Sequence, residues 1–162
     1  MYFITICTDQ KERLLGEVVE GEMHLNRHGE IVNLCWHELR FHYRTIDLDE
    51  FIIMPNHVHG IIKIADRVGA IHEPPLPKTA HERRKMLLPK IVGRFKMNSA
   101  KRINTVRGIA GVPLWQRGYH DHIVRDGAGL DRIRQYILKN PSNWKNDEHF
   151  PRNLHVDAIH KR

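Results

Sequence analysis

Two apolar runs joined by a two-residue turn constrain the fold of this chain more than any other stretch. The first run ends a strand predicted over Thr45–Met54, and the second follows over His57–Ile64. Between them stands Pro55–Asn56; proline fixes φ and supplies no N–H, which suits a turn and not one continuous strand. The pattern predicts an antiparallel hairpin, and the spacing puts His57 and His59 on one face of its second strand.

Periodicity places the other elements around this hairpin. Before the hairpin we expect an inner strand at Tyr2–Thr8, a returning strand at Leu14–Val19 and an amphipathic helix at Gly29–Phe41, whose buried residues would be Ile31, Leu34, Cys35 and Leu39. After the hairpin come a helix marked by Leu88, Ile91, Val92 and Phe95 and a strand at Tyr119–Arg125. A chain break at Gly127–Gly129 then precedes a last helix that ends near Pro141. Without the returning strand and the last helix, this order is βαββαβ, the ferredoxin-like unit. We therefore expect an α+β fold: an antiparallel sheet with helices on one face, plus a C-terminal helix.

The length and the absence of long apolar runs indicate one domain away from membranes. The 162 residues suit a single domain with a core at about residues 2–144 and a polar tail at 145–162. Glu73–Pro77 is rich in proline and predicts an extended connection. No apolar run approaches the roughly 20 residues of a membrane helix, and the N-terminus lacks the basic region of a signal peptide. With no metal or redox spacing between the two cysteines, we expect a cytoplasmic protein.

The net charge of +7, with a pI of about 9.6, favours a polyanionic partner such as nucleic acid. Basic side chains lie along the helix that comes after the proline-rich stretch, and they are candidates for phosphate contacts. Such residues also line ordinary solvated faces. Trp115 beside Arg117 can stack on and pair with an unpaired nucleotide, or it can cover the core. The candidate DNA-binding residues are Lys90, Arg94, Lys96, Lys101, Arg102, Trp115 and Arg117.

Neither His-x-His pair is informative as a bare pattern. With 13 histidines in 162 residues, one such pair is expected about once by chance, and the chain has two, His57/His59 and His120/His122. Two imidazoles on one strand face can hold a metal ion when neither carries a proton on the ligating nitrogen. Other residues must therefore decide whether either pair is a site.

The last helix carries a tyrosine and an asparagine one turn apart. Tyr136 and Asn140 are separated by four residues, so the hydroxyl and the carboxamide lie on the same side of the helix. The plainer interpretation is a tyrosine packed beside the apolar stripe and an asparagine that shapes the helix end before proline.

Three motifs together resemble the single-tyrosine HUH transposases, that is, the REP-associated tyrosine transposases and the insertion-sequence transposases related to them. The motifs are Pro55–Gly60 (PNHVHG), Trp115–His122 (WQRGYHDH) and Tyr136–Pro141 (YILKNP). The resemblance extends from Tyr2 to about Trp144, and it is nearest to the REP-associated group.

The resemblance implies a mechanism and a metal site. His57 and His59 match the two histidines that hold Mg²⁺ or Mn²⁺, and Asn140 matches a side chain that completes the site. Tyr136 matches the nucleophile that cleaves single-stranded DNA, leaving a 5′-phosphotyrosine and a free 3′-OH for later strand transfer. The implied role is DNA transposition, a form of recombination, at hairpin-containing element ends in the bacterial nucleoid.

Several alternatives stay open from the sequence. Asp121 and His122 are candidates for support of the metal ligands, since an aspartate can orient a ligating imidazole. The family includes monomers and homodimers that exchange the tyrosine helix. Histidine-triad hydrolases are disfavoured because Ile61 stands where a third histidine belongs, and the repeated motifs of two-histidine phosphoesterases are absent. The main competitor is a domesticated, non-catalytic DNA- or RNA-binding protein on the same scaffold; the other is a basic structural domain with incidental histidines.

Overall fold

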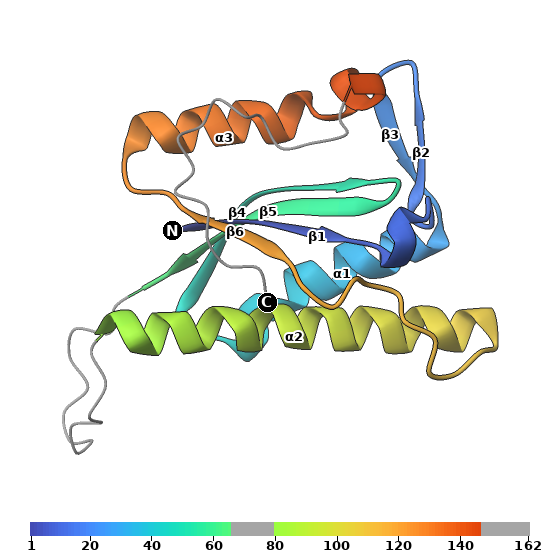
Figure 1. The fold of residues 1–162 in the computed structure, drawn as a ribbon, viewed down its shortest axis with the longest axis horizontal. Helices are drawn as coiled ribbons and strands as arrows, with labels where there is room; N and C mark the ends of the chain where they lie inside the picture. The colour runs from blue at the N-terminus through green and yellow to red at the C-terminus, as the bar shows by residue number, and fades with distance from the viewer. Residues whose placement is uncertain (66–79, 147–162) are drawn as a thin grey trace.

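A four-stranded antiparallel sheet lies at the centre of the computed structural model, which describes residues 1–65 and 80–146 (Figure 1). Its strands are β1 (Tyr2–Cys7), β4 (Ile46–Met54), β5 (His57–Ile64) and β6 (His120–Ile123), in the spatial order β4-β5-β1-β6. One helix connects β1 to β4 and another connects β5 to β6, which is the ferredoxin-like order. The predicted α+β fold class is confirmed. Glu73–Pro77 and the tail from residue 147 lie outside the described residues.

Two helices, α1 (Arg27–His42) and α2 (Ala80–Arg107), cover one face of this sheet (Figure 1). α1 begins where the Asn26 side chain accepts hydrogen bonds from two backbone N–H groups of the first turn. Ile4 and Ile6 of β1 pack beneath the two helices in the larger apolar core. Neither α2 nor another helix in the described parts of the chain has an apolar stretch long enough for a bilayer.

Among the described α-helices, only α3 (Gly127–Lys139) covers the opposite face (Figure 1). Phe3 of β1 and Ile61 of β5 project to this side, and Ile133 and Ile137 of the helix pack on them. Because alternate residues of β1 enter the two cores, this strand is buried on both faces, as the sequence predicted. The last helix thus lies on the sheet face to which His57 and His59 also project.

The start of α3 differs from the prediction. The segment Gly127–Gly129 is the first turn of the helix and not a break before it. Asp126 is the N-cap, and its carboxylate accepts a 2.6 Å hydrogen bond from the Gly129 backbone N–H. The helix ends as expected, since Pro141 opens the short 3₁₀ helix η2 (Pro141–Asn146).

A separate hairpin stands at one end of the sheet. It consists of β2 (Gly16–Val19) and β3 (Glu22–Leu25), so the returning strand predicted over Leu14–Val19 exists in a shorter form. The 3₁₀ turn η1 (Asp9–Lys11) precedes it. The hairpin tip reaches η2: a Cβ placed on Gly21 would lie 3.5 Å from the Ser142 Cα.

The buried face of α1 is rotated from the predicted one. Leu34 is 58% exposed, whereas Trp36 is completely buried. The Trp36 ring stacks on Phe51 at 4.3 Å between centroids and meets Phe95 edge-on. Helical spacing alone predicted that Leu34 is buried. In the structure Trp36 is buried instead, and its large ring fits against the sheet at Gly60, which has no side chain.

Gly60→Ala is expected to destabilise the protein. A Cβ at this position would lie 2.5 Å from two carbons of the buried Trp36 ring, so the helix or the strand must shift. Overpacking of this kind costs about 1–3 kcal/mol. Urea unfolding followed by circular dichroism measures the change. Gly93→Ala is the matched control, because nothing lies within 4 Å of its added methyl, and alanine favours a helix by roughly 0.5–1 kcal/mol; equal stability of the two variants would contradict the packing argument.

Candidate active site

The two histidines of β5 meet through their outer ring nitrogens. His57 and His59 follow the Pro55–Asn56 turn, with 7% and 3% exposure, and the two Nε2 atoms are 3.0 Å apart. In the sheet register, Cys7 and Thr5 of β1 lie opposite them. Since both side chains share one strand face, the two imidazoles converge on one point on the α3 side of the sheet.

Asn56 fixes the ring orientation of His57. Its Nδ2 donates to the backbone carbonyl of Lys11 at 3.2 Å, so its Oδ1 faces His57 Nδ1 at 2.8 Å. An amide oxygen only accepts, and His57 Nδ1 therefore carries the proton. This tautomer puts a lone pair on His57 Nε2, which is the form of imidazole that binds a cation.

Thr5 plays the corresponding role for His59. The Thr5 Oγ1 lies 2.8 Å from His59 Nδ1, across the β1–β5 ladder. Burial, and next the neighbouring His57, hold the pKa of His59 well below its usual range. His59 is thus neutral at pH 7, and a metal ion binding there does not have to displace a proton from an imidazolium.

Tyr136 of α3 reaches this pair. Its hydroxyl lies 3.3 Å from His59 Nε2, and its ring centroid is 5.2 Å from that of His59. Its ring also meets Phe3 edge-on at 6.2 Å. Two elements some eighty positions apart in the sequence, β5 and α3, thus bring a phenol and two imidazoles together.

The side chain of Asn140 is buried at the end of the same helix. The residue is 2% exposed, and within the described residues neither its Oδ1 nor its Nδ2 has a hydrogen-bond partner. It follows Tyr136, which contacts His59, and precedes Trp144, whose ring centroid is 6.0 Å from that of His57. A buried amide without partners costs about 1–3 kcal/mol, so this side chain is suited to a ligand that satisfies it.

These groups fit a divalent cation. An octahedral ion about 2.1 Å from two ligands at right angles separates them by about 3.0 Å, which is the observed Nε2–Nε2 distance. The Asn140 carboxamide, four residues after Tyr136, is predicted to add an oxygen donor. Within the described residues no cluster of three His, Cys, Asp or Glu side chains exists to hold a metal.

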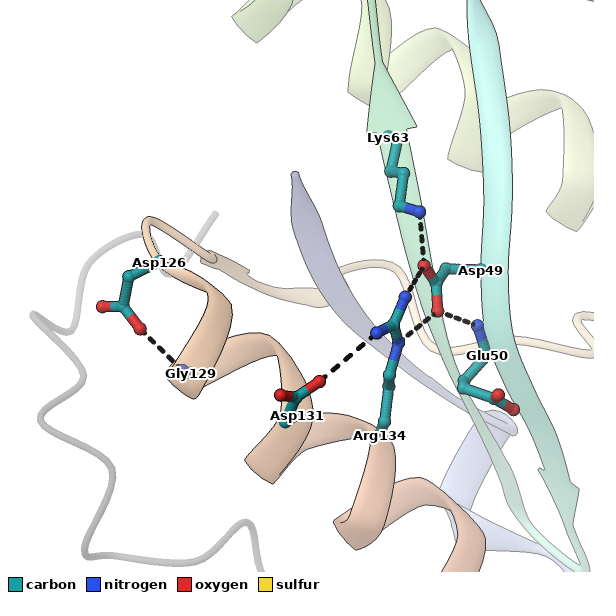
Figure 2. A network of polar contacts seen from close by, with 7 residues as sticks. All are labelled: Asp49, Glu50, Lys63, Asp126, Gly129, Asp131 and Arg134. Carbon is teal, nitrogen blue, oxygen red and sulfur yellow. Dashed lines mark hydrogen bonds and ion pairs between the residues drawn. The ribbon is translucent and has the colours of Figure 1, made fainter.

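An ion-pair network holds α3 against the sheet (Figure 2). Arg134 donates to both carboxylate oxygens of Asp49 at 2.8 and 2.7 Å, and Lys63 Nζ lies 2.6 Å from the same carboxylate. The Asp49 side chain is 7% exposed and sits at the irregular stretch of β4. Hydrogen bonds from Arg134 above all hold the pKa of Asp49 well below its usual range. Arg134 and Tyr136 flank the buried stripe of α3 on opposite sides, so this contact sets the rotation of the helix.

The second histidine pair lies on the same sheet face but farther away. His120 pairs with Thr5 and His122 with Phe3, so β1 separates them from β5. Two strand spacings amount to about 10 Å. Asp121 pairs with Ile4 and therefore projects to the α1–α2 side, away from the His57/His59 pair. We expected Asp121 to orient a metal-bound imidazole, but this register directs its side chain away from the histidine pair. Thr5 and Asn56 contact the Nδ1 atoms of His59 and His57 instead.

Four of the predicted DNA-binding side chains have structural partners. One of them, Arg94, lies 3.2 Å from His42 Nδ1 and is still exposed. Trp115 is 6% exposed, and its Nε1 donates to Ser99 Oγ at 2.9 Å, so it belongs to the core and cannot stack on a nucleotide. Lys96 Nζ donates to three successive backbone carbonyls that begin at Gln116, and burial lowers its pKa. Arg102 forms a two-bond ion pair with Glu38 of α1.

Like Arg94, the remaining candidates Lys90, Lys101 and Arg117 are exposed. Three of these four residues belong to α2, on the sheet face opposite the histidine pair (Figure 1). Sequence spacing had indicated a basic stripe on this helix, but it could not show that the stripe and the histidines lie in different layers.

The fold is that of a known class of DNA-transposition enzymes. The structure of a REP-associated tyrosine transposase bound to a REP hairpin aligns with a TM-score of 0.52 and 14% identity, over 88% of this chain and 67% of that one. A crystal structure of a Deinococcus radiodurans R1 protein described as a candidate transposase aligns with a TM-score of 0.43 and 18% identity, over 85% and 87%. The first alignment establishes the transposase-like fold that the sequence motifs predicted.

No protein-family profile matches the chain. A Haemophilus influenzae protein of uncharacterised function is 37% identical over 160 residues, which is 96% of this chain and 85% of that protein. The chain belongs to the same family as this Haemophilus protein.

Proposed function

We propose that this protein is a metal-dependent transesterase that cleaves single-stranded DNA and transfers the strand through a covalent tyrosine intermediate. The observation that supports it most is the position of the Tyr136 hydroxyl, 3.3 Å from His59 Nε2, which itself lies 3.0 Å from His57 Nε2. A nucleophile beside two convergent imidazoles is the arrangement that phosphodiester chemistry with a metal needs.

His57, His59 and Asn140 would hold the ion, either Mg²⁺ or Mn²⁺. Such an ion supplies Lewis-acid catalysis: it neutralises phosphate charge and polarises the phosphodiester. Thr5 and Asn56 keep both Nδ1 atoms engaged, so the Nε2 atoms face the ion. The amide oxygen suits both metals, whereas the two imidazole nitrogens favour Mn²⁺ over the harder Mg²⁺, which prefers oxygen ligands.

Tyr136 would perform the bond exchange. The phenol oxygen bonds to the 5′-phosphate while the bond from phosphorus to the 3′ oxygen breaks, and the phenol proton ends on the released 3′-OH. Because a phosphodiester replaces a phosphodiester, the bond energy is conserved and no ATP is required. A different 3′-OH reverses the step and completes strand transfer.

Single-stranded DNA with hairpin structure is the substrate we propose. The net charge of +7 favours a nucleic acid, and the REP-associated transposase of similar fold is bound to a REP hairpin. The closing experiment is an adduct assay on hairpin oligonucleotides with single-stranded flanks. After incubation with Mn²⁺ and denaturation, a 3′-end label should migrate with the protein, and a 5′-end label should mark a fragment that a polymerase can extend. Binding without any adduct, over several hairpins and both metals, would instead support the non-catalytic DNA-binding alternative.

His57→Ala is expected to abolish stabilisation by Mn²⁺. An ion that binds only the folded state stabilises it by about 2.7 kcal/mol at 100 times its Kd, and His57 provides one of the two convergent nitrogens. Thermal unfolding with and without Mn²⁺ measures the shift in Tm without any need for catalysis. His122→Ala is the control and should keep the shift, because β1 separates His122 from the site. The reverse outcome would move the metal site to the second pair.

A further inference from the structure

One end of the sheet carries an arginine and a tryptophan beside His57. The guanidinium carbon of Arg13 lies over the Trp144 ring, 5.6 Å from its centroid, and the Trp144 ring is 6.0 Å from that of His57. Arg13 is exposed and Trp144 is half-buried. Neither contact is needed for the metal ligands or the nucleophile described above.

The loop that carries Arg13 is tied to the histidine strand. Thr8 N–H donates to the Asn56 carbonyl at 2.9 Å, and Leu15 N–H donates to the Pro55 carbonyl at 3.0 Å. Between these two anchors, Gln10 and Lys11 both have left-handed backbone angles, with φ of 50° and 56°. Such conformations cost non-glycine residues about 1–3 kcal/mol each and tend to occur at functional sites.

Trp144 is held from two directions. Its 3₁₀ helix is joined to the end of α3 by the hydrogen bond from Asn143 N–H to the Asn140 carbonyl, 3.1 Å. The tip of the β2–β3 hairpin at Gly21 lies against Ser142 of the same helix. The two side chains are thus presented on well-anchored segments, on the sheet face that holds His57 and Tyr136.

We propose that Arg13 and Trp144 form the binding site for the nucleotide next to the scissile phosphate. This proposal rests on the proposed function and extends it to the contacts that seat the strand. The guanidinium matches a phosphate with two parallel hydrogen bonds, and an indole stacks on any unpaired base. The cation–π contact holds Arg13 in place before DNA arrives, which lowers the entropy cost of ordering it.

This surface is better placed than the basic stripe of α2. Arg13 and Trp144 share a sheet face with the candidate nucleophile, whereas α2 covers the other face. Of the three tryptophans, Trp36 and Trp115 are 0% and 6% exposed, so Trp144 is the one that a base can reach.

DNA binding by Tyr136→Phe protein tests the proposal without cleavage. Fluorescence anisotropy with a labelled hairpin oligonucleotide bearing a single-stranded flank gives Kd over a range of NaCl concentrations. Arg13→Gln should raise Kd about tenfold and lower the slope of log Kd against log salt by about 0.7, the value for one phosphate contact on a single strand. Arg40→Gln is the matched control: Arg40 of α1 is also exposed, and its guanidinium also lies over an aromatic ring, that of Phe41, 5.1 Å from the centroid. The Kd of this variant should stay within about twofold of the parent.

A second measurement keeps the test independent of the Arg13 variant. Oligonucleotide binding in EDTA should quench intrinsic fluorescence, and Trp144→Phe should remove the quenching. Equal affinities of Arg13→Gln and Arg40→Gln, or quenching that survives in Trp144→Phe, would overturn the proposal. If Arg13→Gln weakens binding but wild type never forms an adduct, the binding surface stands and the transesterase function falls. If the adduct forms and neither side chain matters to Kd, only the surface falls.

Discussion

Tyr136→Phe should eliminate the covalent protein–DNA adduct while leaving the fold and DNA affinity intact. The substitution removes the hydroxyl, which is the sole difference between the two side chains, and it keeps the ring contacts with Phe3 and His59. Since the phenol oxygen is the atom proposed to bond to phosphorus, no adduct above background is expected. Denaturing gels with 3′-labelled hairpin DNA measure the adduct, and thermal unfolding and anisotropy confirm folding and binding.

Tyr43→Phe is the matched control for this experiment. Its hydroxyl donates to the Lys90 carbonyl in the α1–α2 layer at 3.3 Å, on the other side of the sheet. This variant should form the adduct at the wild-type rate. An adduct that persists in Tyr136→Phe would show that another side chain is the nucleophile, and peptide mapping of the linked residue would then identify it.

Asp49→Asn is expected to slow adduct formation about 100-fold, the scale of loss that a displacement of about 1 Å causes at a reacting centre. The carboxylate joins Arg134 of α3 to Lys63 of β5, and its loss releases the flank of the helix opposite Tyr136 (Figure 2). Single-turnover rates at saturating DNA measure the effect. Affinity should change little, because Asp49 lies away from the proposed DNA contacts at Arg13 and Trp144. A loss of affinity with an unchanged rate would contradict this positioning role.

Glu38→Gln controls for the loss of an ion pair as such. It breaks a similar two-bond contact with Arg102, which joins α1 to α2 far from Tyr136, and it should leave the adduct rate unchanged.

Acid unfolding tests the contribution of Asp49 to stability. Its native pKa is depressed, so its stabilisation is present above the unfolded value of about 3.9 and is lost as the pH falls below it. Wild type should therefore lose more stability than Asp49→Asn between pH 5 and pH 2.

Local signals predicted the parts of the site that depend on one element. The proline turn and the alternating pattern after it predicted that His57 and His59 lie on one face of β5. Helical spacing predicted that Tyr136 and Asn140 lie on one side of the last helix. The union of these two elements on one sheet face came from the resemblance to a known family. Physical pattern alone carried no information on the distance between residues 59 and 136.

Features that depend on strand register or on burial could not be predicted from the sequence. Thr5 supports His59 only because β1 and β5 align these two residues, and strand register is not written in either strand alone. Trp115 and Trp144 both have basic neighbours, yet one fills the core next to Phe95 and Ser99 while the other stands beside His57. Which of the two is buried depends on the partner helix, and no local pattern distinguishes them.

The strand order has a consequence for biosynthesis. The first strand made, β1, sits between β5 and β6, so the sheet closes only after the ribosome has passed residue 123. The histidines are then in place, but the proposed nucleophile belongs to α3, and Trp144 lies in η2 beyond it. A nascent chain released early would carry the proposed ion ligands of β5 without Tyr136. The proposed cleavage activity would therefore require synthesis to continue past α3, after the sheet that holds the histidines has formed.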